Sequence, residues 1–252
     1  MSSIKLNELI AIIPARSGSK GVKDKNIIEI NSVPLLALSI AAAKSAGIER
    51  VIVSTDSKEY AKLAVRFGAE VPFFRPAHLS DDSSTDYDFM YHAMSWFREN
   101  ENVVPEYWVH LRPTTPFRVP EVLNGAIAML LSSNNANSLR SAHKAPESPH
   151  KWFLKDDNDF FIPFKTSLSA EELNSPRQKF DSVYIPNGYI DIVRSSFVFR
   201  EEILHDKNML VYETPQIIEI DTEFELETIH AISKYKEPFI VNYAQKIDLL
   251  KN

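Results

Sequence analysis

The sequence predicts a three-layer α/β domain with a mostly parallel sheet, and three observations lead to this prediction. Short apolar runs that suit buried strands alternate with longer helical segments along the first half of the chain. Glycine and proline residues mark the starts and ends of these segments. The chain has 252 residues, of which 44% are hydrophobic, so a single domain over residues 1–252 can bury a sizeable core. In such a domain, ligands bind where the carboxyl ends of the strands meet their loops.

The first half of the chain alternates between strands and helices. The run LIAIIP is too short for a helix and ends at a loop rich in Gly, Ser and Lys, which is typical of a buried parallel strand. Pro34 and Gly47 suit the first turn and the end of a helix, and Asp56 and Gly68 suit the cap and the end of the next helix. The predicted elements are a strand over Leu9–Pro14, a helix over residues 34–46, a strand over 50–54, a helix over 57–67, a strand over 107–111 and a helix over Pro120–Leu131.

The pattern changes between residues 132 and 186, where Asn, Ser and Pro are frequent and no helical period is sustained except near residues 169–174. We expect a small inserted lobe over this segment. After it, the segments 189–193 and 197–204 resume the alternation, and a predicted strand over residues 216–220 is followed by a helix that starts at Thr222.

Composition excludes several kinds of chemistry and partner. Because the chain has no cysteine, disulfides, thiolate metal sites and cysteine nucleophiles are excluded. The net charge is −6, so the chain as a whole lacks the excess of positive charge that is typical of proteins that bind nucleic acid. No window approaches the roughly 18 consecutive apolar residues that a membrane span requires. The N-terminus shows no signal-peptide pattern, so we expect a cytoplasmic protein without nucleic-acid or membrane partners.

A basic loop follows the first predicted strand. Gly18 and Gly21 allow the backbone to wrap closely around phosphate oxygens, and Arg16 and Lys20 would neutralise the phosphates. The loop matches neither G-x-x-x-x-G-K-[ST] nor G-x-G-x-x-G, which removes the main support for an ATPase or a dinucleotide-dependent dehydrogenase. The alternative is a polar surface turn, but these residue types converge directly after a buried strand. The loop is therefore predicted to bind phosphate.

Two carboxylates near the C-terminus form a candidate metal site. Glu219 and Asp221 lie two residues apart on the predicted strand, so both would project from one face. A magnesium ion needs only one or two carboxylates together with substrate phosphates. The alternative is that Asp221 or Thr222 caps the following helix, and Thr222 with Glu225 does form a capping-box pattern. The two interpretations are compatible, because the cap uses Thr222 and leaves Asp221 free.

Two further polar segments are ambiguous from their residues alone. The loop RPTTP at 112–116 follows a predicted buried strand, and its prolines stiffen it, which suits either substrate positioning or an ordinary strand-to-helix turn. The acidic stretch at 81–88 is typical of a solvated turn.

Five motifs carry a resemblance to a known family. They are IIPARSGSKGVKDKN at 12–26, RP at 75–76 with LSDDSST at 79–85, HLRPTTPFR at 110–118, RQ at 177–178 with NG at 187–188, and EIDTE at 219–223. Together they resemble the CMP-sialic acid synthetases, also called acylneuraminate cytidylyltransferases, over nearly the whole chain. The resemblance implies a Rossmann-like α/β/α nucleotidyltransferase domain, a homodimer, and an inserted lobe that serves as its dimerisation arm. From the residues alone, a lid over the substrate fits this lobe equally well.

The resemblance also implies roles for individual residues, and the carboxylate pair adds the metal site. The predicted catalytic residues are Arg16, Lys20 and Asp221; the nucleotide-binding residues are Arg16, Ser19, Lys20, Lys25, Asn26, Arg75 and Thr85; the sugar-binding residues are Arg112, Lys151, Arg177, Asn187 and Asp191; and the ligands of Mg²⁺ are Asp221 and Glu219.

Three positions depart from the pattern of the resembling family. Arg112 stands where Gln is usual, Asp191 where Tyr is common, and Glu219 where the first Asp is usual. The first two lie near the predicted sugar site, so the motifs do not name the sugar.

These observations predict a reaction in which the anomeric hydroxyl of a sugar acid attacks the α-phosphate of CTP and releases pyrophosphate, with Mg²⁺ bridging the phosphates. The expected acceptor is a nine-carbon acid of the sialic, legionaminic or pseudaminic type, whose carboxylate suits a guanidinium such as Arg112 or Arg177. Two alternatives stay open at this point. The first is an enzyme that activates an eight-carbon 3-deoxy acid or joins another nucleotide to a sugar phosphate, and the second is a nucleotide-binding regulator without turnover.

Overall fold

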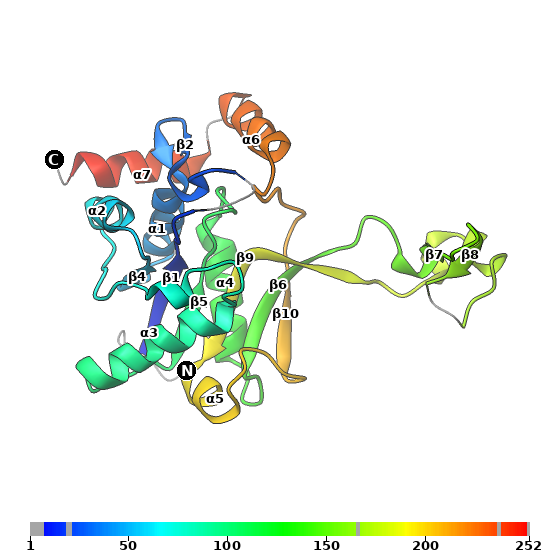
Figure 1. Cartoon of the computed structure of the whole chain (residues 1–252), viewed down its shortest axis with the longest axis horizontal. Helices are drawn as coiled ribbons and strands as arrows, with labels where there is room; N and C mark the ends of the chain where they lie inside the picture. The colour runs from blue at the N-terminus through cyan, green and yellow to red at the C-terminus, as the bar shows by residue number, and fades with distance from the viewer. Residues whose placement is uncertain (1–7, 19–21, 165–166, 236–237, 251–252) are drawn as a thin grey trace.

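The computed structural model describes residues 8–18, 22–164, 167–235 and 238–250. Its centre is a six-stranded sheet in the order β10-β6-β9-β5-β1-β4 (Figure 1). Strand β9 runs antiparallel to both of its neighbours, while the other pairs of adjacent strands are parallel. The prediction of a mostly parallel sheet is therefore confirmed. The strands are β1 (Leu9–Pro14), β4 (Val51–Ser54), β5 (Tyr107–His110), β6 (Ser138–Lys144), β9 (Tyr184–Arg194) and β10 (Met209–Glu213).

Helices cover both faces of the sheet and complete the three layers. In β1, Ala11 and Ile13 pack into one apolar cluster, whereas Ile10 and Ile12 pack into another on the opposite face. The first cluster is built with α1 (Leu35–Ser45), α2 (Lys58–Arg66), α4 (Pro120–Leu131), α6 (Glu223–Tyr235) and α7 (Phe239–Leu249). The second is built with α3 (Asp86–Asn100) and α5 (Ser195–Glu201).

The starts and ends of the helices follow local sequence signals. Helix α1 begins directly after Pro34 and is followed by Gly47, whose φ of 82° is the left-handed conformation that glycine adopts freely. Ahead of α1, a short hairpin joins β2 (Glu29–Ile30) to β3 (Val33–Pro34). The prediction that Asp56 caps α2 is wrong, because the Ser57 hydroxyl accepts the bond from the Tyr60 N–H instead. Among the described helices, none has the length and apolar character needed to cross a membrane.

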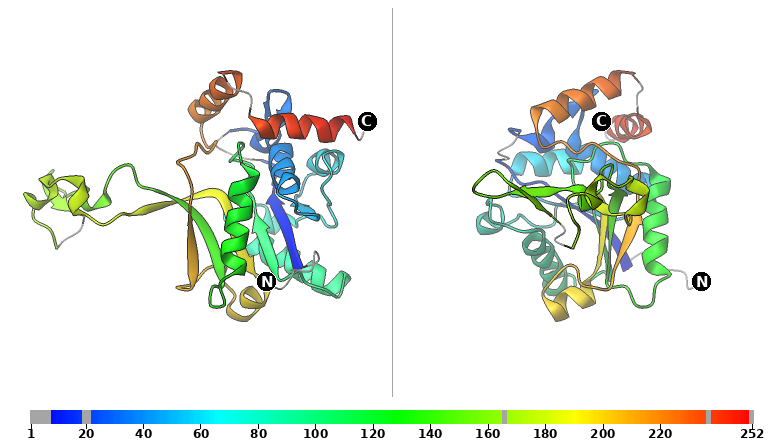
Figure 2. Two further views of the ribbon diagram at one scale, coloured as in Figure 1. Left: turned by 180° about the vertical axis from the view of Figure 1, so that it is seen from behind. Right: turned by 90° about the vertical axis from the view of Figure 1, so that its right-hand side faces the viewer.

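A slender arm projects from the sheet between β6 and β9, and Figures 1 and 2 show it standing clear of the main body. Its tip is a hairpin of β7 (Phe153–Lys155) and β8 (Phe161–Pro163). The arm lies within the segment of about 132–186 that suggested an inserted lobe. Lys144 still pairs with Tyr184, so the segment that leaves the sheet runs only from residue 145 to residue 183.

The sequence analysis missed α3, β6, β10, α7 and the short β2–β3 hairpin, and it predicted a strand where none forms. Helix α3 begins inside the acidic stretch that suggested a solvated turn, because Thr85 and Asp88 form a capping box. The predicted strand over residues 216–220 is absent, and β10 at Met209–Glu213 takes the edge position by pairing with β6. Because that strand is absent, the argument that Glu219 and Asp221 share one strand face no longer applies.

Candidate active site

A cavity of about 370 Å³ lies where the carboxyl ends of β1 and β5 meet the start of α3, the edge at which parallel strands present their loops. Seven predicted site residues line it, although they are spread over more than 200 positions of the chain. They are Arg16, Lys25, Asn26, Arg75, Thr85, Arg112 and Asp221.

The basic loop is anchored at both of its described ends. Asp56, at the end of β4, accepts hydrogen bonds from the Ser17 N–H at 2.8 Å and from the Ser17 hydroxyl at 2.6 Å. The Asn26 amide donates to the carbonyl of Arg16 at 2.9 Å. Gly18 has a φ of 73°, as expected for a loop that turns sharply. The predicted phosphate ligands Ser19 and Lys20 lie outside the described residues.

Arg16 reaches from this loop to the segment that precedes α3. Its guanidinium donates to a carboxylate oxygen of Asp82 at 3.0 Å and to the carbonyl of Ser80 at 3.3 Å. About a third of its side chain remains exposed. The acidic stretch therefore contacts the basic loop at the mouth of the cavity.

Lys25 and Asp221 form an ion pair across the cavity, with 2.8 Å between Nζ and Oδ1. The Lys25 side chain is 15% exposed, whereas that of Asp221 is 69% exposed, so one oxygen of the carboxylate is held while the group stays open to the cavity. The capping box at Thr222 and Glu225 is present, as predicted. Glu225 accepts from the main-chain N–H of Asp221, so this cap does not engage the Asp221 carboxylate.

Arg75 is a buried cation in the wall of the cavity. It donates to the Ser54 hydroxyl at 3.0 Å and to the Ser54 carbonyl at 2.7 Å, and its guanidinium carbon lies 4.8 Å from the ring centre of Phe89. Burial lowers its pKa to about 10, so Arg75 stays charged at neutral pH. Among the described residues, no carboxylate is in direct contact with Arg75, so this buried positive charge is well placed to attract an anionic or electron-rich ligand.

Arg112 is held between two carboxylates. It donates to Asp191 at 2.8 Å and to Asp86 at 2.5 Å, and Asp191 is only 2% exposed. Burial alone would lower the pKa of Arg112, but the charges of Asp191 and Asp86 outweigh burial and raise it above its ordinary value. The buried His110 lies 3.9 Å from Asp191, and burial holds its pKa well below the ordinary value, so its ring is neutral. Both acidic partners are in direct contact with the Arg112 guanidinium.

Arg118 is a structural arginine that the sequence analysis did not single out. It is 2% exposed and donates to four main-chain carbonyls and to the Ser39 hydroxyl. Among the carbonyls are those of Arg112 and Gly188, so Arg118 joins the loop after β5 to strand β9. Burial lowers its pKa to about 9. No signal in the sequence separates such an arginine from a surface one.

Gly188 and Glu219 make a contact that only glycine permits. Glu219 Oε1 accepts from the Gly188 N–H at 2.7 Å and from the Thr115 hydroxyl at 3.2 Å. A Cβ on residue 188 would lie 2.1 Å from this oxygen. The neighbouring Asn187 is 5% exposed, and its amide bonds to Ser141 and Thr214. Sugar binding by Asn187 and metal binding by Glu219 therefore remain predictions, and the contacts seen for both side chains are with the protein.

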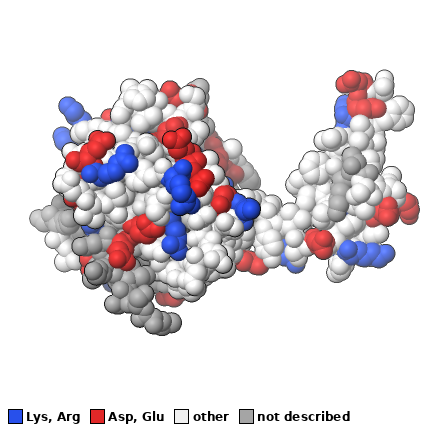
Figure 3. All heavy atoms as spheres, turned by 90° about the horizontal axis from the view of Figure 1, so that it is seen from below, with Lys and Arg blue, Asp and Glu red and all other residues white. Residues whose placement is uncertain are grey.

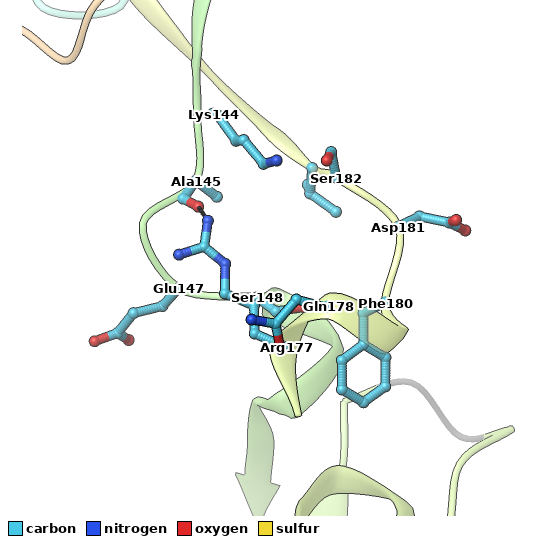
Figure 4. A pocket seen from close by; sticks show the side chains of 10 residues that line it. Lys144, Ala145, Glu147, Ser148, Arg177, Gln178, Phe180, Asp181 and Ser182 are labelled. Atoms are coloured by element: carbon cyan, nitrogen blue, oxygen red, sulfur yellow. Dashed lines mark hydrogen bonds between the residues drawn. The ribbon is translucent and has the colours of Figure 1, made fainter. Parts of the chain in front are cut away.

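Lys151 and Arg177 are not part of this cavity, because both lie on the arm. Lys151 donates to the carbonyl of Ser175 at 3.2 Å. Arg177 donates to the carbonyls of Pro146 and Ala145 at 2.6 and 2.9 Å, closing the base of the arm beside a second cavity of about 450 Å³ (Figure 4). Neither residue lines the cavity of about 370 Å³, and their contact with a sugar stays a prediction.

Comparisons with known proteins agree with this geometry. The family of cytidylyltransferases matches residues 10–242. The chain is 30% identical to an N-acylneuraminate cytidylyltransferase of Escherichia coli over 97% of its own length, but it spans only 55% of that relative. It is 29% identical to a CMP-N,N'-diacetyllegionaminic acid synthase of Campylobacter jejuni, covering 91% of this chain and 96% of that protein.

A solved structure shares the fold. A CMP:2-keto-3-deoxy-manno-octonic acid synthetase complexed with CTP superposes with a TM-score of 0.66, covering 91% of this chain and 99% of that chain at 16% identity. At this identity the likeness concerns the fold alone. The Rossmann-like nucleotidyltransferase architecture is thus confirmed, and the chain belongs to the cytidylyltransferase family.

Proposed function

We propose that this protein transfers CMP from CTP to the anomeric hydroxyl of a nonulosonic acid and releases pyrophosphate. The observation that carries the proposal is the cavity of about 370 Å³ in which Arg16, Lys25, Arg75 and Asp221 converge at the carboxyl ends of the strands. Three cations and one exposed carboxylate suit a triphosphate with a divalent cation. The legionaminic acid synthase and the N-acylneuraminate cytidylyltransferase among the relatives support a nine-carbon acid as the acceptor.

In this proposal, different residues of the cavity bind different parts of the nucleotide. Arg16, Lys25 and the loop between them bind the phosphates, and Lys20 of that loop adds a further positive charge. Arg75 and Thr85 lie beside the nucleoside. Such a reaction needs little covalent participation by the protein, because placing the two reactants and stabilising the charge on the α-phosphate supply most of the rate enhancement.

Magnesium is the cofactor that we propose, and the donor set fits it. Asp221 offers an exposed carboxylate whose Oδ1 contacts Lys25. Asp221 would hold the cation, and Lys25 would contribute a positive charge to the phosphates. The Oε1 atom of Glu219 accepts two hydrogen bonds, so this carboxylate would be the secondary ligand. When bound, the cation offsets the charge of the phosphates and polarises the attacking oxygen.

The proposal is tested by incubating the protein with Mg²⁺, each of the four ribonucleoside triphosphates and a panel of sugar acids, and by measuring pyrophosphate release. Release with CTP and a nine-carbon acid is the expected result. Release only with an eight-carbon 3-deoxy acid would replace the acceptor. CTP binding with no release for any acceptor would make the protein a nucleotide-binding regulator.

We also propose that the arm joins two copies into a homodimer. Its tip exposes a cluster of large apolar side chains, and much of its surface carries no charged group (Figure 3). The exposed residues are Trp152, Phe153, Leu154, Phe160, Phe161 and Phe164, with Phe160 at 70%. Lys151 and Arg177 lie on this arm. In the proposed dimer, the arm of one copy would bring these two residues to the sugar site of its partner.

Light scattering coupled to size-exclusion chromatography measures this assembly. The double variant Phe153→Ser with Phe160→Ser is expected to be monomeric, while Phe224→Ser, an equally exposed phenylalanine on the main domain, stays dimeric. A wild-type protein that elutes as a monomer at micromolar concentration contradicts the proposal.

A further inference from the structure

The start of α2 contacts the basic loop at two separate points. Asp56, which directly precedes the N-cap Ser57, accepts from Ser17 at the beginning of the loop. In the first turn of the helix, the Tyr60 hydroxyl donates to Oδ1 of Asp24 at 3.2 Å, close to the end of the loop. The same helix start therefore holds the loop near both of its described ends.

Asp24 has a backbone conformation that needs support. Its φ of 51° and ψ of 32° are left-handed, a region in which a residue with a side chain is strained, although aspartate tolerates it better than most. Asp24 is the N-cap of the short helix η2 (Lys25–Ile27). Among the described residues, its carboxylate makes no capping bond to that helix and is bonded to Tyr60 instead. The Tyr60 hydroxyl therefore stabilises the turn from outside the loop.

The turn at Asp24 sets the direction of two residues of the cavity. Lys25 follows it directly and reaches Asp221 across the cavity, and Asn26 comes next and donates to the main chain at the start of the loop. The Ile27 N–H donates to the Asp24 carbonyl at 3.0 Å, which closes the turn. A change in φ and ψ at Asp24 would redirect both cavity residues, because these two angles decide where the following chain goes.

Tyr60 is suited to hold Asp24 in a fixed place. It is 2% exposed, and its ring packs in the apolar cluster that contains Ala11 and Ile13, so its side chain has little room to move. Burial raises the pKa of Tyr60, and the charge of Asp24 acts in the same direction, so the hydroxyl keeps its proton and is the donor in this bond. Tyr60 does not line the cavity of about 370 Å³, so any effect on a ligand there passes through the loop.

We propose that Tyr60 is a positioning residue for nucleotide binding, which acts through Asp24 to hold Lys25 toward the phosphates. This inference rests on the proposed reaction with CTP. A merely structural role of Tyr60 resides in its ring, which fills the core, whereas the proposed role resides in its hydroxyl. Tyr60→Phe separates the two roles, because it removes the hydroxyl and keeps the ring.

The test compares wild type with Tyr60→Phe and with the control Tyr107→Phe, which removes a hydroxyl at the amino end of β5, away from the cavity. Calorimetric titration with CTP and Mg²⁺ measures Kd, and steady-state kinetics measures KM and kcat. In Tyr60→Phe, Kd and KM for CTP are expected to rise about fivefold, the scale of one lost hydrogen bond to a carboxylate, while kcat at saturating CTP stays within about twofold of wild type. Tyr107→Phe should keep the wild-type values.

Variants of Asp24 show whether the effect passes through this residue. Asp24→Gly removes the acceptor and keeps a residue that adopts the left-handed conformation freely, so adding Tyr60→Phe to it should cause no further rise in KM. Asp24→Asn keeps an acceptor and tolerates the same conformation, so it should stay close to wild type. In Tyr60→Phe, hydrogen exchange of the Ile27 amide, which closes the turn, should be faster when followed by NMR.

The outcomes separate this inference from the proposed function. If wild type releases pyrophosphate with CTP and Tyr60→Phe raises KM equally in the wild-type and Asp24→Gly backgrounds, or in neither, the role of Tyr60 is overturned while the function stands. A fall in kcat with an unchanged KM also overturns it. If wild type binds CTP but releases no pyrophosphate with any acceptor, the transfer reaction is overturned, and the comparison of Kd values alone decides the role of Tyr60. If wild type binds none of the four ribonucleoside triphosphates, both are overturned.

Discussion

Arg112 donates to Asp191 across 2.8 Å, and both residues depart from the pattern of the CMP-sialic acid synthetases that the motifs resemble. The sequence presented these as two separate anomalies, 79 positions apart. In the structure they are one ion pair in the wall of the candidate active site. A guanidinium and a carboxylate replace two uncharged side chains together, which explains why neither departure leaves a buried charge without a partner.

The pair predicts a non-additive effect on stability. Asp191→Asn leaves Arg112 and Arg140 without their shared counter-charge and is expected to cost about 3 kcal/mol of unfolding free energy. The double variant Arg112→Gln with Asp191→Tyr should cost less than the sum of its single variants by at least about 1 kcal/mol. Urea unfolding of the four proteins measures this cycle. Strict additivity would mean that the pair is not energetically coupled.

Asp56 is predicted to position the phosphate loop without touching the nucleotide. Asp56→Ala removes both acceptors of Ser17, and we expect the KM for CTP to rise about tenfold, a loss of about 1.4 kcal/mol that is typical of one hydrogen bond to a charged group. Asp56→Asn keeps one acceptor and should recover part of this loss. The kcat at saturating CTP should change little in either variant. A large fall in kcat with an unchanged KM would show that Asp56 acts on the chemical step instead.

Asp221 is predicted to be the principal magnesium ligand. Asp221→Asn should lower kcat by at least about 100-fold, equivalent to about 2.7 kcal/mol, and should raise the Mg²⁺ concentration for half-maximal activity. Asp157→Asn, an exposed carboxylate on the arm, serves as the matched control. Activity is also expected to disappear on addition of EDTA and to return with excess Mg²⁺. Full activity of Asp221→Asn at low Mg²⁺ would contradict the assignment.

Gly188 is predicted to be required for the position of Glu219. Gly188→Ala places a Cβ where the Glu219 carboxylate lies, so we expect kcat/KM to fall at least about tenfold. The same substitution in a Glu219→Ala background should cost much less, because the obstructing carboxylate is gone. Steady-state kinetics of the four proteins separates the two cases. Equal losses in both backgrounds would place the cause elsewhere in the backbone.

Buried histidines predict a loss of stability in mild acid. Burial lowers the pKa of His110, and also those of His92 and His205, below that of an unfolded chain. The unfolded state therefore binds more protons, and the stability present above pH 6.5 is lost as the pH falls through and below this value. Thermal unfolding midpoints should drop between pH 7.5 and pH 5. His110→Asn should flatten this slope, and an unchanged slope would exclude a contribution from His110.

The sequence was most informative where local chemistry decides the structure. The boundaries of β1 and α4 were predicted to the residue, because a short apolar run and a proline at a helix start depend only on their neighbours. Helix α3 was missed, since an acidic capping box looks like a solvated turn until the helix behind it is seen. The prediction of a strand at 216–220 was wrong, because a strand forms only beside a partner strand and β6 pairs with β10 instead.

The candidate site shows the same contrast between features that local sequence determines and features that strand order determines. Motifs located the cavity residues Arg16, Lys25, Arg75 and Asp221, because each belongs to a short segment that ends at the same edge of the sheet. They did not reveal that Arg118 holds the loop after β5, or that Arg140 lies beside Asp191. Both contacts depend on which strands are neighbours in the sheet, and the sequence of a single segment does not determine the order of the strands.

Strand β9 belongs at once to the arm and to the active site. It extends from Tyr184, where the arm leaves the sheet, past Asp191, which contacts Arg112, to Arg194. Its pairing with β6 shifts register between Pro186 and Asp191, so the root of the arm and the wall of the candidate site are separated by an irregular stretch of the same strand. In the proposed dimer, the residues at the root of the arm and Asp191 beside the candidate site are therefore carried by one strand, so a substitution in β9 is expected to affect both dimerisation and the choice of acceptor.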